Sequence, residues 1–567
     1  MGAQQWYGSF GRRVAIALVV LGVTVAIPVG TGNAGAQTVA RPEGAGPPPA
    51  GTGMGTKKAM SRSDCNADRG PYGRLNGVYQ GSGPVCVVAW KKGADNGGAT
   101  AQGVTKDKIR VVVVTPNPTQ LAAQVAGVPQ NRQTGKPGLM SDAFTDNLAA
   151  VKGFYETYGR DIDLQYVEST GNDEAAQRAD ALKVEELKPF AVIDSLSTGL
   201  DTLETVIAAD KILVTGYAAT TEKALKQAPY RWGQSDSQAV AYNVSEMVGK
   251  QLVGKKAAWA GDDSLKSKPR VFAMIYATGV IDPKQFDTAL AKYKGKTAEN
   301  FAYKGNGSPL GDKEQAQQDA PPMIVKMKSE GVTSVILFTD IGMTSVLLEQ
   351  ANKQDFHPEW IMTGNQFQDA VFLDRNSYDQ SQWAHAFGTS GFAPTYQDGV
   401  KTVDPVAWYW GASQGTYNSV VDSWLQWLLG GIHTAGPKLT AKTFQQGLFA
   451  TPAPQNDAQI GSYYGKNARL PYDEYMAGTV TFAPSWYDSA TEGPDNIYGD
   501  RIGKGVLWYL NDGARYHSGG WPTKPLGFFS KNGAVVSKPT RPVPLVLSPC
   551  TNCPSNGGPG VPSNRGA

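Results

Sequence analysis

Short runs of apolar residues alternate with longer amphipathic stretches through the middle of the chain. Residues 108–114 include four consecutive valines and are followed by the turn Pro116-Asn117-Pro118, a pattern typical of a buried strand. From Phe144 to Tyr158, apolar side chains recur at spacings of three and four, which predicts a helix that ends at Gly159. The alternation continues with predicted strands at 162–167, 190–193 and 212–215 and predicted helices at 174–187 and 201–209. This order predicts β-α-β units and a parallel sheet covered on both faces.

A second series of the same kind begins after Ser237. We predict helices at 239–252, 284–293 and 343–352, strands at 271–276, 301–303, 334–338 and 360–363, and a helix that begins at Pro321-Pro322, where missing N–H groups are tolerated. Beyond Gly388 the pattern loosens, but it still predicts an apolar helix around Trp424 and a helix at 441–448 capped by Thr440. Two such series predict an α/β protein with two three-layer parallel-sheet lobes, joined by hinge crossovers near Ser237, Gly388 and Ala450.

The first residues have the pattern of a secretory signal peptide. Arg12 and Arg13 precede an apolar run of about 16 residues, and Ala34-Gly35-Ala36 forms a cleavage pattern, so we expect residues 1–36 to be removed. A membrane anchor is the alternative, but the run is shorter than the ~20 apolar residues of a spanning helix. No cysteine for lipid attachment lies near the cleavage position. We therefore expect a secreted, extracytoplasmic protein that meets the membrane only through a partner; the arginine pair leaves Sec and twin-arginine export both open.

Four cysteines lie in two pairs near the ends of the chain. The even number in an oxidising compartment favours disulfides, and we favour Cys65 with Cys86 and Cys550 with Cys553. Pairing between the two ends and a four-thiolate zinc site are the alternatives. The domain prediction is a Pro- and Gly-rich extension at 37–102, lobe 1 at 103–237 and 388–450, lobe 2 at 238–387 and 451–546, and a tail at 547–567.

Charge and motif content exclude several classes of function. The chain has 53 basic and 50 acidic residues, and the basic residues are scattered, so nothing favours nucleic acid as a partner. The four histidines form no H-E-x-x-H pattern, and no phosphate-binding G-x-x-x-x-G-K-[ST] occurs. We therefore expect neither a metal nor another cofactor.

One motif supports an enzyme as the competing interpretation. Residues 411–415, Gly-Ala-Ser-Gln-Gly, match the G-x-S-x-G nucleophile elbow of α/β-hydrolases, and Asp495 and His517 would complete a Ser-Asp-His order. Alternatively, Pro405 opens a single long helix at 406–429 that contains Ser413. Five-residue motifs with two free positions arise often by chance, so we favour a protein that is not an enzyme.

Four local strings occur in an order that resembles a known family. They are Gly-Val-Thr-Lys-Asp-Lys-Ile-Arg-Val at 103–111, Asp-Ser-Leu-Ser-Thr-Gly at 194–199, Val-Thr-Gly-Tyr-Ala-Ala-Thr-Thr at 214–221 and Arg-Trp-Gly-Gln-Ser-Asp-Ser-Gln at 231–238. Their order and spacing resemble the type I periplasmic binding proteins, and specifically the Leu/Ile/Val-binding group of ABC importers. The resemblance covers about residues 103–450.

The resemblance implies a ligand site between the lobes. The loops concerned follow strands and precede helices, an arrangement that favours anions. On the first lobe, the family's contacts fall on Ser197 and Thr198 for a ligand carboxylate, and on Ala218, Thr220 and Asp236 for a polar or amino group. On the second lobe they fall on Tyr276 and, three residues from the family's usual carboxylate, on Asp340. Met343 occupies that usual position. Simple helix capping is the alternative role for the serine and threonines.

The resemblance implies a solute-binding protein that captures a small polar or anionic molecule in an interlobe cleft for an ABC importer, with the permease as its protein partner. A ligand sensor or scaffold with the same fold and no transporter is one alternative. A secreted serine hydrolase that uses Ser413 is the other.

Overall fold

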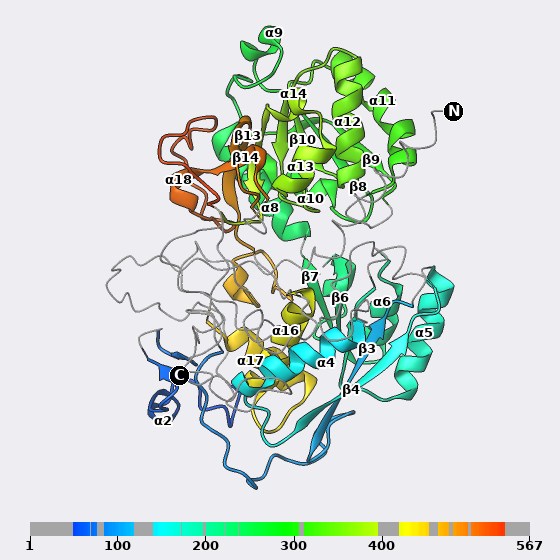
Figure 1. The fold of residues 1–567 in the computed structure, drawn as a ribbon, viewed down its shortest axis with the longest axis vertical. Helices are drawn as coiled ribbons and strands as arrows, with labels where there is room; N and C mark the ends of the chain where they lie inside the picture. Colours follow the sequence, from blue (N-terminus) through cyan, green and yellow to red (C-terminus); the bar gives the residue numbers. More distant parts are fainter. Residues whose placement is uncertain are drawn as a thin grey trace.

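The computed structural model describes two α/β lobes stacked along the long axis of the molecule (Figure 1). The described residues are 49–67, 70–75, 84–117, 140–171, 173–196, 200–219, 222–235, 237–305, 311–394, 419–452, 463–475, 480–496 and 501–538. The expected signal peptide, Ser413, Cys550 and Cys553 lie outside these residues. Within them, no helix combines the length and apolar character that crossing a membrane requires.

The first lobe contains a five-stranded, fully parallel sheet in the order β4-β3-β5-β6-β7. Its strands are β3 (Lys108–Thr115), β4 (Asp161–Glu168), β5 (Ala191–Asp194), β6 (Leu213–Ala219) and β7 (Arg231–Ser235). Val111 and Val113 pack toward α4 (Met140–Val151) and α16 (Ser419–Ala435), whereas Val112 and Val114 pack toward α5 (Glu174–Glu186) and α6 (Thr202–Ala209). Consecutive valines are required here because both faces of the strand are covered.

The second lobe contains an eight-stranded sheet in the order β15-β14-β13-β12-β11-β10-β8-β9. The parallel strands are β8 (Phe272–Ala277), β9 (Thr297–Tyr303), β10 (Ser334–Phe338), β11 (Glu359–Met362) and β12 (Ala386–Ser390); β13 (Ala483–Gly493), β14 (Gly503–Tyr509) and β15 (Val535–Val536) add antiparallel. One face packs on α8 (Ser237–Gln251) and α10 (Pro283–Ala291), and the other on α11 (Lys313–Ser329), α12 (Ile341–Lys353) and α13 (Val371–Ser377). The predicted α/β fold of two three-layer lobes is confirmed, with an antiparallel extension that we did not predict.

The remaining elements are short or lie outside the sheets. They are α2 (Lys57–Met60), β1 (Cys65–Asn66), β2 (Arg74–Leu75), α7 (Glu222–Leu225), α9 (Asp263–Lys266), α14 (Gln380–Trp383), α17 (Ala441–Ala450), α18 (Leu510–Gly513) and 3-10 turns at Lys152–Phe154 and Lys466–Ala468. The α17 cap is as predicted, because the Thr440 hydroxyl accepts from Thr443 N and the Thr443 hydroxyl accepts from Thr440 N.

Two predicted helix limits are wrong. Helix α11 begins at Lys313, where the Asp312 carboxylate accepts from two backbone N–H groups, and Pro321 and Pro322 lie inside the helix. The carbonyls that these prolines leave without an N–H partner belong to exposed residues, which water can reach. Helix α4 ends at Val151 and gives way to a 3-10 turn, so Tyr158, with a φ of 57°, lies beyond it.

The first change of lobe falls between β7 and α8, next to the expected Ser237, whereas the later changes differ from the expected positions. Strand β12 pairs with β11 in the second sheet, so residues 386–390 belong to the second lobe and the chain returns to α16 only after them. Residues 463–475 contact both lobes, because Gly233 N of the first lobe donates to Tyr475 O at 2.9 Å, whereas Tyr463 and Leu470 pack with Ala239 of α8. The chain thus still contacts the first lobe at Tyr475, well beyond the expected passage near Ala450. Val480 packs with Ala239 of α8, so two of the passages contact each other.

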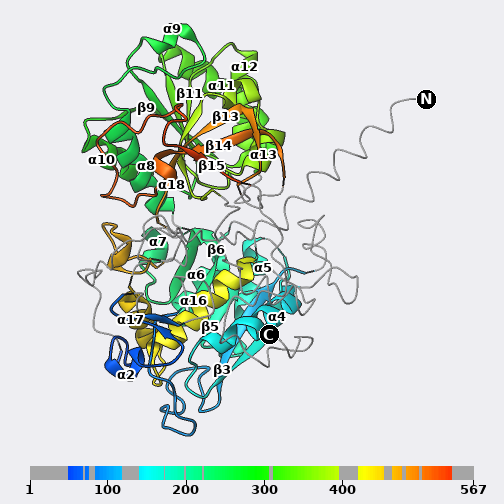
Figure 2. The same cartoon turned by 60° about the vertical axis from the view of Figure 1, so that its left-hand side comes forward.

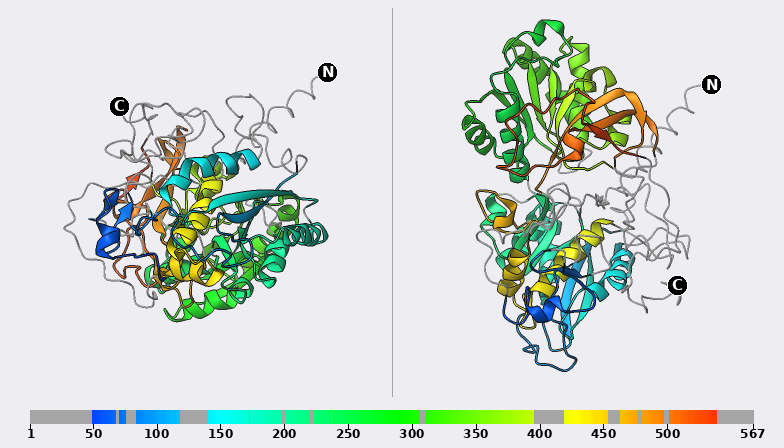
Figure 3. Two further views of the ribbon diagram at one scale, coloured as in Figure 1. Left: turned by 90° about the horizontal axis from the view of Figure 1, so that it is seen from below. Right: turned by 90° about the vertical axis from the view of Figure 1, so that its left-hand side faces the viewer.

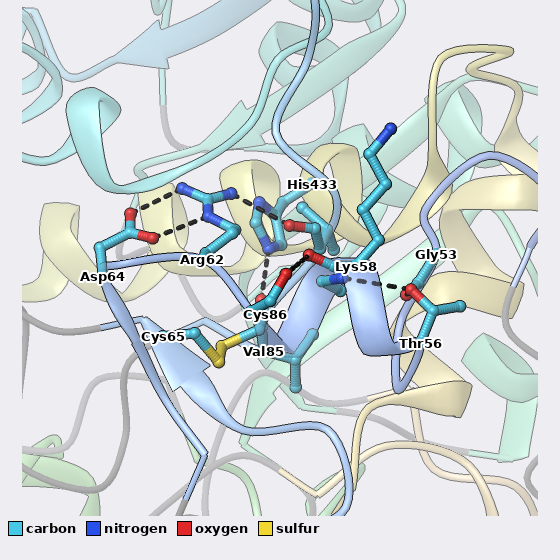
Figure 4. The surroundings of a disulfide bond; sticks show 12 residues. Gly53, Thr56, Lys58, Arg62, Asp64, Cys65, Val85, Cys86 and His433 are labelled. Atoms are coloured by element: carbon cyan, nitrogen blue, oxygen red, sulfur yellow. Dashed lines mark hydrogen bonds and ion pairs between the residues drawn. A yellow bond between two sulfur atoms is a disulfide. The ribbon is translucent and has the colours of Figure 1, made fainter.

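The described residues of the segment 49–102, here called the N-terminal arm, lie against the first lobe beside α16 and α17 (Figure 2). A disulfide joins Cys65 to Cys86, as predicted for this pair, and Figure 4 shows its surroundings. Near it, His433 at the end of α16 donates from Nε2 to Val85 O and accepts at Nδ1 from Glu156 N, both at 2.8 Å. The arm is thus connected to the lobe through a buried side chain.

Candidate functional site

The carboxyl ends of the parallel strands in each lobe face the other lobe. Strand β7 ends at Ser235 and leads directly into α8 of the second lobe, and all strands of the first sheet run parallel to it. Strand β12 ends at Ser390, and the next described helix, α16, belongs to the first lobe (Figure 1). Parallel α/β sheets bind ligands at this edge, so the space between the lobes has a binding edge on each side.

On the first lobe, the turn after β5 is held by two side chains. Ser195 Oγ donates to Val114 O at 2.6 Å, and Asp194 Oδ1 accepts from Leu196 N at 2.9 Å. These contacts fix the direction in which the chain leaves the strand toward residue 197. The backbone of Ala218 lies in the last part of β6, at the same edge.

The predicted first-lobe contacts fall mostly outside the described part of the chain. Ser197, Thr198, Thr220 and Asp236 lie outside the described residues, and for Ala218 only the backbone is described. These assignments therefore stay predictions.

A buried ionic cluster lies directly below that edge. Glu204 of α6 pairs with the Arg231 guanidinium of β7 at 3.2 Å, and the same guanidinium contacts Asp201 at 3.0 Å. Burial, reinforced by repulsion from Glu204, raises the pKa of Asp194 well above its usual range. Residue 216 must be glycine, because a Cβ there would lie 2.2 Å from Glu204 Oε1. No local sequence pattern predicted this cluster.

On the second lobe, Asp340 is placed as a helix cap. It is 2% exposed, its Oδ1 accepts from Met343 N at 2.8 Å, and its Oδ2 accepts from the Tyr303 hydroxyl at 2.8 Å. Burial raises the pKa of Asp340, and burial also raises that of Tyr303. Met343 itself is buried in the core. Both Asp340 oxygens thus have protein partners in this conformation, and the predicted contact between Asp340 and a ligand stays a prediction.

Tyr276, the other predicted second-lobe residue, lies near the carboxyl end of β8. It is paired with Phe338 of β10 and Ala302 of β9 and is only partly buried. Its position on the edge is compatible with a ligand contact, because its side chain is not closed within the core.

The loop after β11 is a further candidate that sequence reasoning missed. Gln366 and Phe367 have φ values of 49° and 63°, a conformation that costs free energy in residues other than glycine and is often found at functional sites. Asn365 Nδ2 and Asp369 Oδ1 are buried and have no hydrogen-bond partner among the described residues. The sequence Thr-Gly-Asn directly after a buried strand was the available signal.

Asp369 also connects this loop to the end of β12. Its Oδ2 accepts from Ser390 Oγ at 2.5 Å and from Gly391 N at 2.8 Å. Burial raises the pKa of Asp369. Arg515 then donates to the carbonyls of Gly391 and Phe392, at 2.8 and 2.6 Å. The carboxyl ends of β11 and β12 are therefore held together by side chains.

The residues proposed for a hydrolase have other partners. Asp495 accepts from Arg501 N at 3.1 Å, and His517 contacts Arg469 and the Ser518 carbonyl. Within the described ranges, no three His, Cys, Asp or Glu residues are placed to hold a metal ion.

A small cavity of about 90 Å³ lies beside the N-terminal arm, away from the strand ends. It is lined by Arg62, Asp64, Leu75 and residues 153–156. The guanidinium of Arg62 is already paired with Asp64 at 2.6 Å. This cavity therefore lies apart from the strand ends at which the solute site is expected.

The sequence matches no family model and no curated protein. Solved structures with a similar fold include a solute-binding protein of an ABC transporter from R. palustris in complex with 4-hydroxybenzoate, with 14% identity, a TM-score of 0.42 and coverage of 72% of this chain and 95% of that chain. A fatty acid ABC transporter substrate-binding protein from Thermomonospora curvata has 13% identity, a TM-score of 0.45 and coverage of 73% and 94%. A putative branched-chain amino acid ABC transporter from Rhodospirillum rubrum has 13% identity, a TM-score of 0.41 and coverage of 72% and 99%. These solved structures are type I periplasmic binding proteins of ABC transporters, the group that the sequence motifs resemble.

Proposed function

We propose that this protein is an extracytoplasmic solute-binding protein that captures a small molecule between its lobes. The observation that carries the proposal is that the carboxyl ends of the parallel strands of both sheets face each other across the lobe passages. Such edges combine helix N-termini with loop hydroxyls and are the usual ligand sites of open α/β sheets. Opening and closing about the passages would be a hinge motion.

The ligand is a small polar or anionic molecule. Ser197, Thr198, Ala218, Thr220 and Asp236 would contact it from the first lobe, and Tyr276 and Asp340 from the second. Because Met343 is buried and both Asp340 oxygens accept bonds within the protein, a ligand carboxylate or hydroxyl has more available partners than an ammonium group. One of the similar structures contains 4-hydroxybenzoate, and another is named as a fatty acid transporter protein. A carboxylate ligand of either kind is compatible with this chemistry.

A permease of an ABC importer is the proposed protein partner, and the protein is proposed to have no enzymatic activity. Permease and ATPase genes beside this gene would favour import, whereas their absence would favour a sensor or scaffold with the same fold. A fluorophosphonate probe should leave Ser413 unlabelled. Labelling that disappears in Ser413→Ala would contradict the binding-protein proposal for that region.

The decisive test is a thermal-shift screen of amino acids, aromatic and aliphatic carboxylates, amides and sterol-like compounds. Calorimetry on Ser197→Ala and Thr220→Ala should then show affinity weakened by roughly 10- to 100-fold, because each hydroxyl that bonds a charged group contributes about 1.5–3 kcal/mol. Ser264→Ala, at an exposed cap of α9, is the matched control and should bind normally. Unchanged affinity in both site variants would show that the assigned contacts are wrong. Best binding by branched-chain amino acids would instead indicate that Asp340 leaves its cap to bind the ammonium group.

A further inference from the structure

The loops that follow β11 and β12 of the second lobe carry two stacked aromatic rings. The ring centroids of Phe367, after β11, and Phe392, after β12, are 6.1 Å apart, with 28° between the ring planes. Phe392 is 7% exposed, whereas Phe367 is only partly buried, so Phe367 is the outer ring of the pair. Both loops leave the carboxyl ends of parallel strands, which is the edge that this lobe turns toward the other one.

The turn that carries Phe367 is strained. Gln368 N donates to Asn365 O at 3.2 Å and closes the turn. Between them, Gln366 and Phe367 have φ values of 49° and 63°, as in a type I′ turn, which favours glycine, asparagine and aspartate. The other neighbouring non-glycine residues with positive φ in the described ranges are Asn511-Asp512, two types that tolerate this conformation. Placing Phe367 at this edge therefore costs free energy, as is common where a side chain serves binding.

Two polar groups of the same turn have no partner. Asn365 Nδ2 and Asp369 Oδ1 are buried and make no hydrogen bond to any described residue. Asn365 is 8% exposed and Asp369 1% exposed, so bulk water does not replace the missing partners, and leaving such groups unpaired is costly. A ligand hydroxyl suits both groups, because it can accept from an amide N–H and donate to a carboxylate oxygen. The turn thus places an apolar ring beside polar groups that need a partner from outside the chain.

The second ring is held in place from two sides. The other carboxylate oxygen of Asp369, Oδ2, accepts from Ser390 Oγ and Gly391 N. Arg515 donates to the carbonyls of Gly391 and Phe392. These contacts fix Phe392 relative to the turn that carries Phe367, so the pair of rings loses little conformational entropy when a ligand binds against it.

We propose that Phe367, Phe392 and Asn365 form the second-lobe wall of the ligand site and select a hydroxylated aromatic acid. The ligand ring would lie against Phe367, its hydroxyl would bond to Asn365 and Asp369, and its carboxylate would face the first lobe. Polar groups at opposite ends of the ring are expected, because their partners lie on opposite lobes. The inference rests on the proposed function and gives that site a class of ligand.

Calorimetry of the full-length chain with 4-hydroxyphenylacetate, phenylacetate and cyclohexylacetate separates the two parts of the wall. The hydroxyl should strengthen binding about 10-fold over phenylacetate, and the flat ring should strengthen it about 5-fold over cyclohexylacetate. Asn365→Ala should remove the first difference, and Phe367→Leu should remove the second. Phe529→Leu is the matched control, because Phe529 is also partly buried and has a φ of 62°, but packs on Trp259 and Phe387 near the amino ends of the strands. It should bind all three compounds as the wild type does.

Gln366→Gly tests the strain separately. It should raise the melting temperature by about 2 °C, because glycine adopts positive φ without cost, and it should weaken binding of 4-hydroxyphenylacetate about 3-fold, because Phe367 is then less fixed. A turn with a merely structural role would not lose affinity while it gains stability.

Equal affinity of the wild type for phenylacetate and cyclohexylacetate, or an unchanged difference in Phe367→Leu, would overturn the proposal. If the three probes fail to bind while another compound of the screen binds, this inference is wrong and the proposed function stands. Binding of no compound at all would contradict both.

Discussion

The two lobes are completed by opposite ends of the described chain, and in different ways. The first lobe keeps five parallel strands and is covered beside α16 and α17 by the N-terminal arm, whose only described strands are the two short ones that pair with each other. The second lobe instead extends its sheet, because β13 pairs antiparallel with β12, and β14 and β15 continue the antiparallel pairing beyond it (Figure 3). One lobe is thus completed by side-chain contacts and the other by a hydrogen-bond ladder.

Arginine side chains bound to backbone carbonyls occur in both lobes. In the first lobe, Arg160 donates to Asn96 O at 2.6 Å and to Pro437 O at 2.8 Å, which joins the arm to the loop after α16. In the second, Arg375 donates to Gly505 O and Gly493 O beside β13 and β14. Where no neighbouring strand satisfies a carbonyl, an arginine can do so, since its guanidinium has five donors. The ladder alone therefore does not complete the second lobe.

The largest expected effect tests whether the second lobe depends on arginine side chains that bind backbone carbonyls. Arg515→Ala should lower the free energy of unfolding by about 4 kcal/mol, because it removes a charged donor from the carbonyls of Gly391, Phe392 and Thr481. Urea unfolding, with hydrogen exchange resolved by lobe, should show the loss in the second lobe. Arg178→Ala, from an exposed pair with Glu174, is the control and should cost less than about 0.5 kcal/mol. Equal losses in the two variants would contradict the role of Arg515.

The disulfide tests the arm of the first lobe. Replacing Cys65 and Cys86 by serine should lower the free energy of unfolding by about 3 kcal/mol, because the bridge closes a loop with a sequence separation of 21 residues. Exchange should increase in the arm and at the ends of α16 and α17, while the second lobe stays protected. Wild-type protein under reducing conditions should behave in the same way. Increased exchange in both lobes would show that the arm stabilises the second lobe as well as the first.

Acid should also act on the arm, through His433. Burial lowers the pKa of His433 to about 4, and its Nδ1 already accepts from Glu156 N, so a proton there would face another donor. Because the folded state resists protonation, stability falls as the pH drops below the ordinary value of about 6.5, by about 2 kcal/mol at pH ~4.5. Urea midpoints across this range measure the loss. His433→Gln should be less stable at neutral pH but should lack this part of the pH dependence.

The smallest expected effect compares one helix cap from each lobe. Thr440→Ala removes the capping box of α17, and Asp312→Ala removes the acceptor for two N–H groups of α11. Each should cost about 1 kcal/mol, measured by urea unfolding, and Thr440→Ser should cost much less. A cost well above this for Asp312→Ala alone would indicate that the internal prolines make α11 depend on its first turn.

Local patterns predicted the sheets well, because burial on both faces imposes a continuous apolar run. The strand predicted at 334–338 is β10, and the valine run at 108–114 is β3 with one further residue. The antiparallel extension could not be predicted in this way. Its register joins Phe387 to Trp486, and a pairing between segments so distant in the sequence leaves no local pattern in either one.

The candidate site was less predictable than the fold. Asp340 was chosen as a carboxylate near the family's usual position, but an aspartate just before a helix also has the ordinary signature of an N-cap, which is the role it has in this conformation. The Asp194 and Glu204 pair depends on two elements meeting at Gly216, and sequence spacing does not reveal that contact. Ser197, Thr198, Thr220 and Asp236 stay predictions.

The core of the first lobe has a consequence for the order in which the protein can fold during synthesis. That core includes Val104 and Tyr475, and α16 covers one face of its sheet. A ribosome completes all the parallel strands of the second lobe before it adds α16. Until then the nascent first sheet has an uncovered apolar face, which favours binding to chaperones or to other chains. The first lobe must therefore finish folding late, and a fragment that ends before α16 should not fold alone.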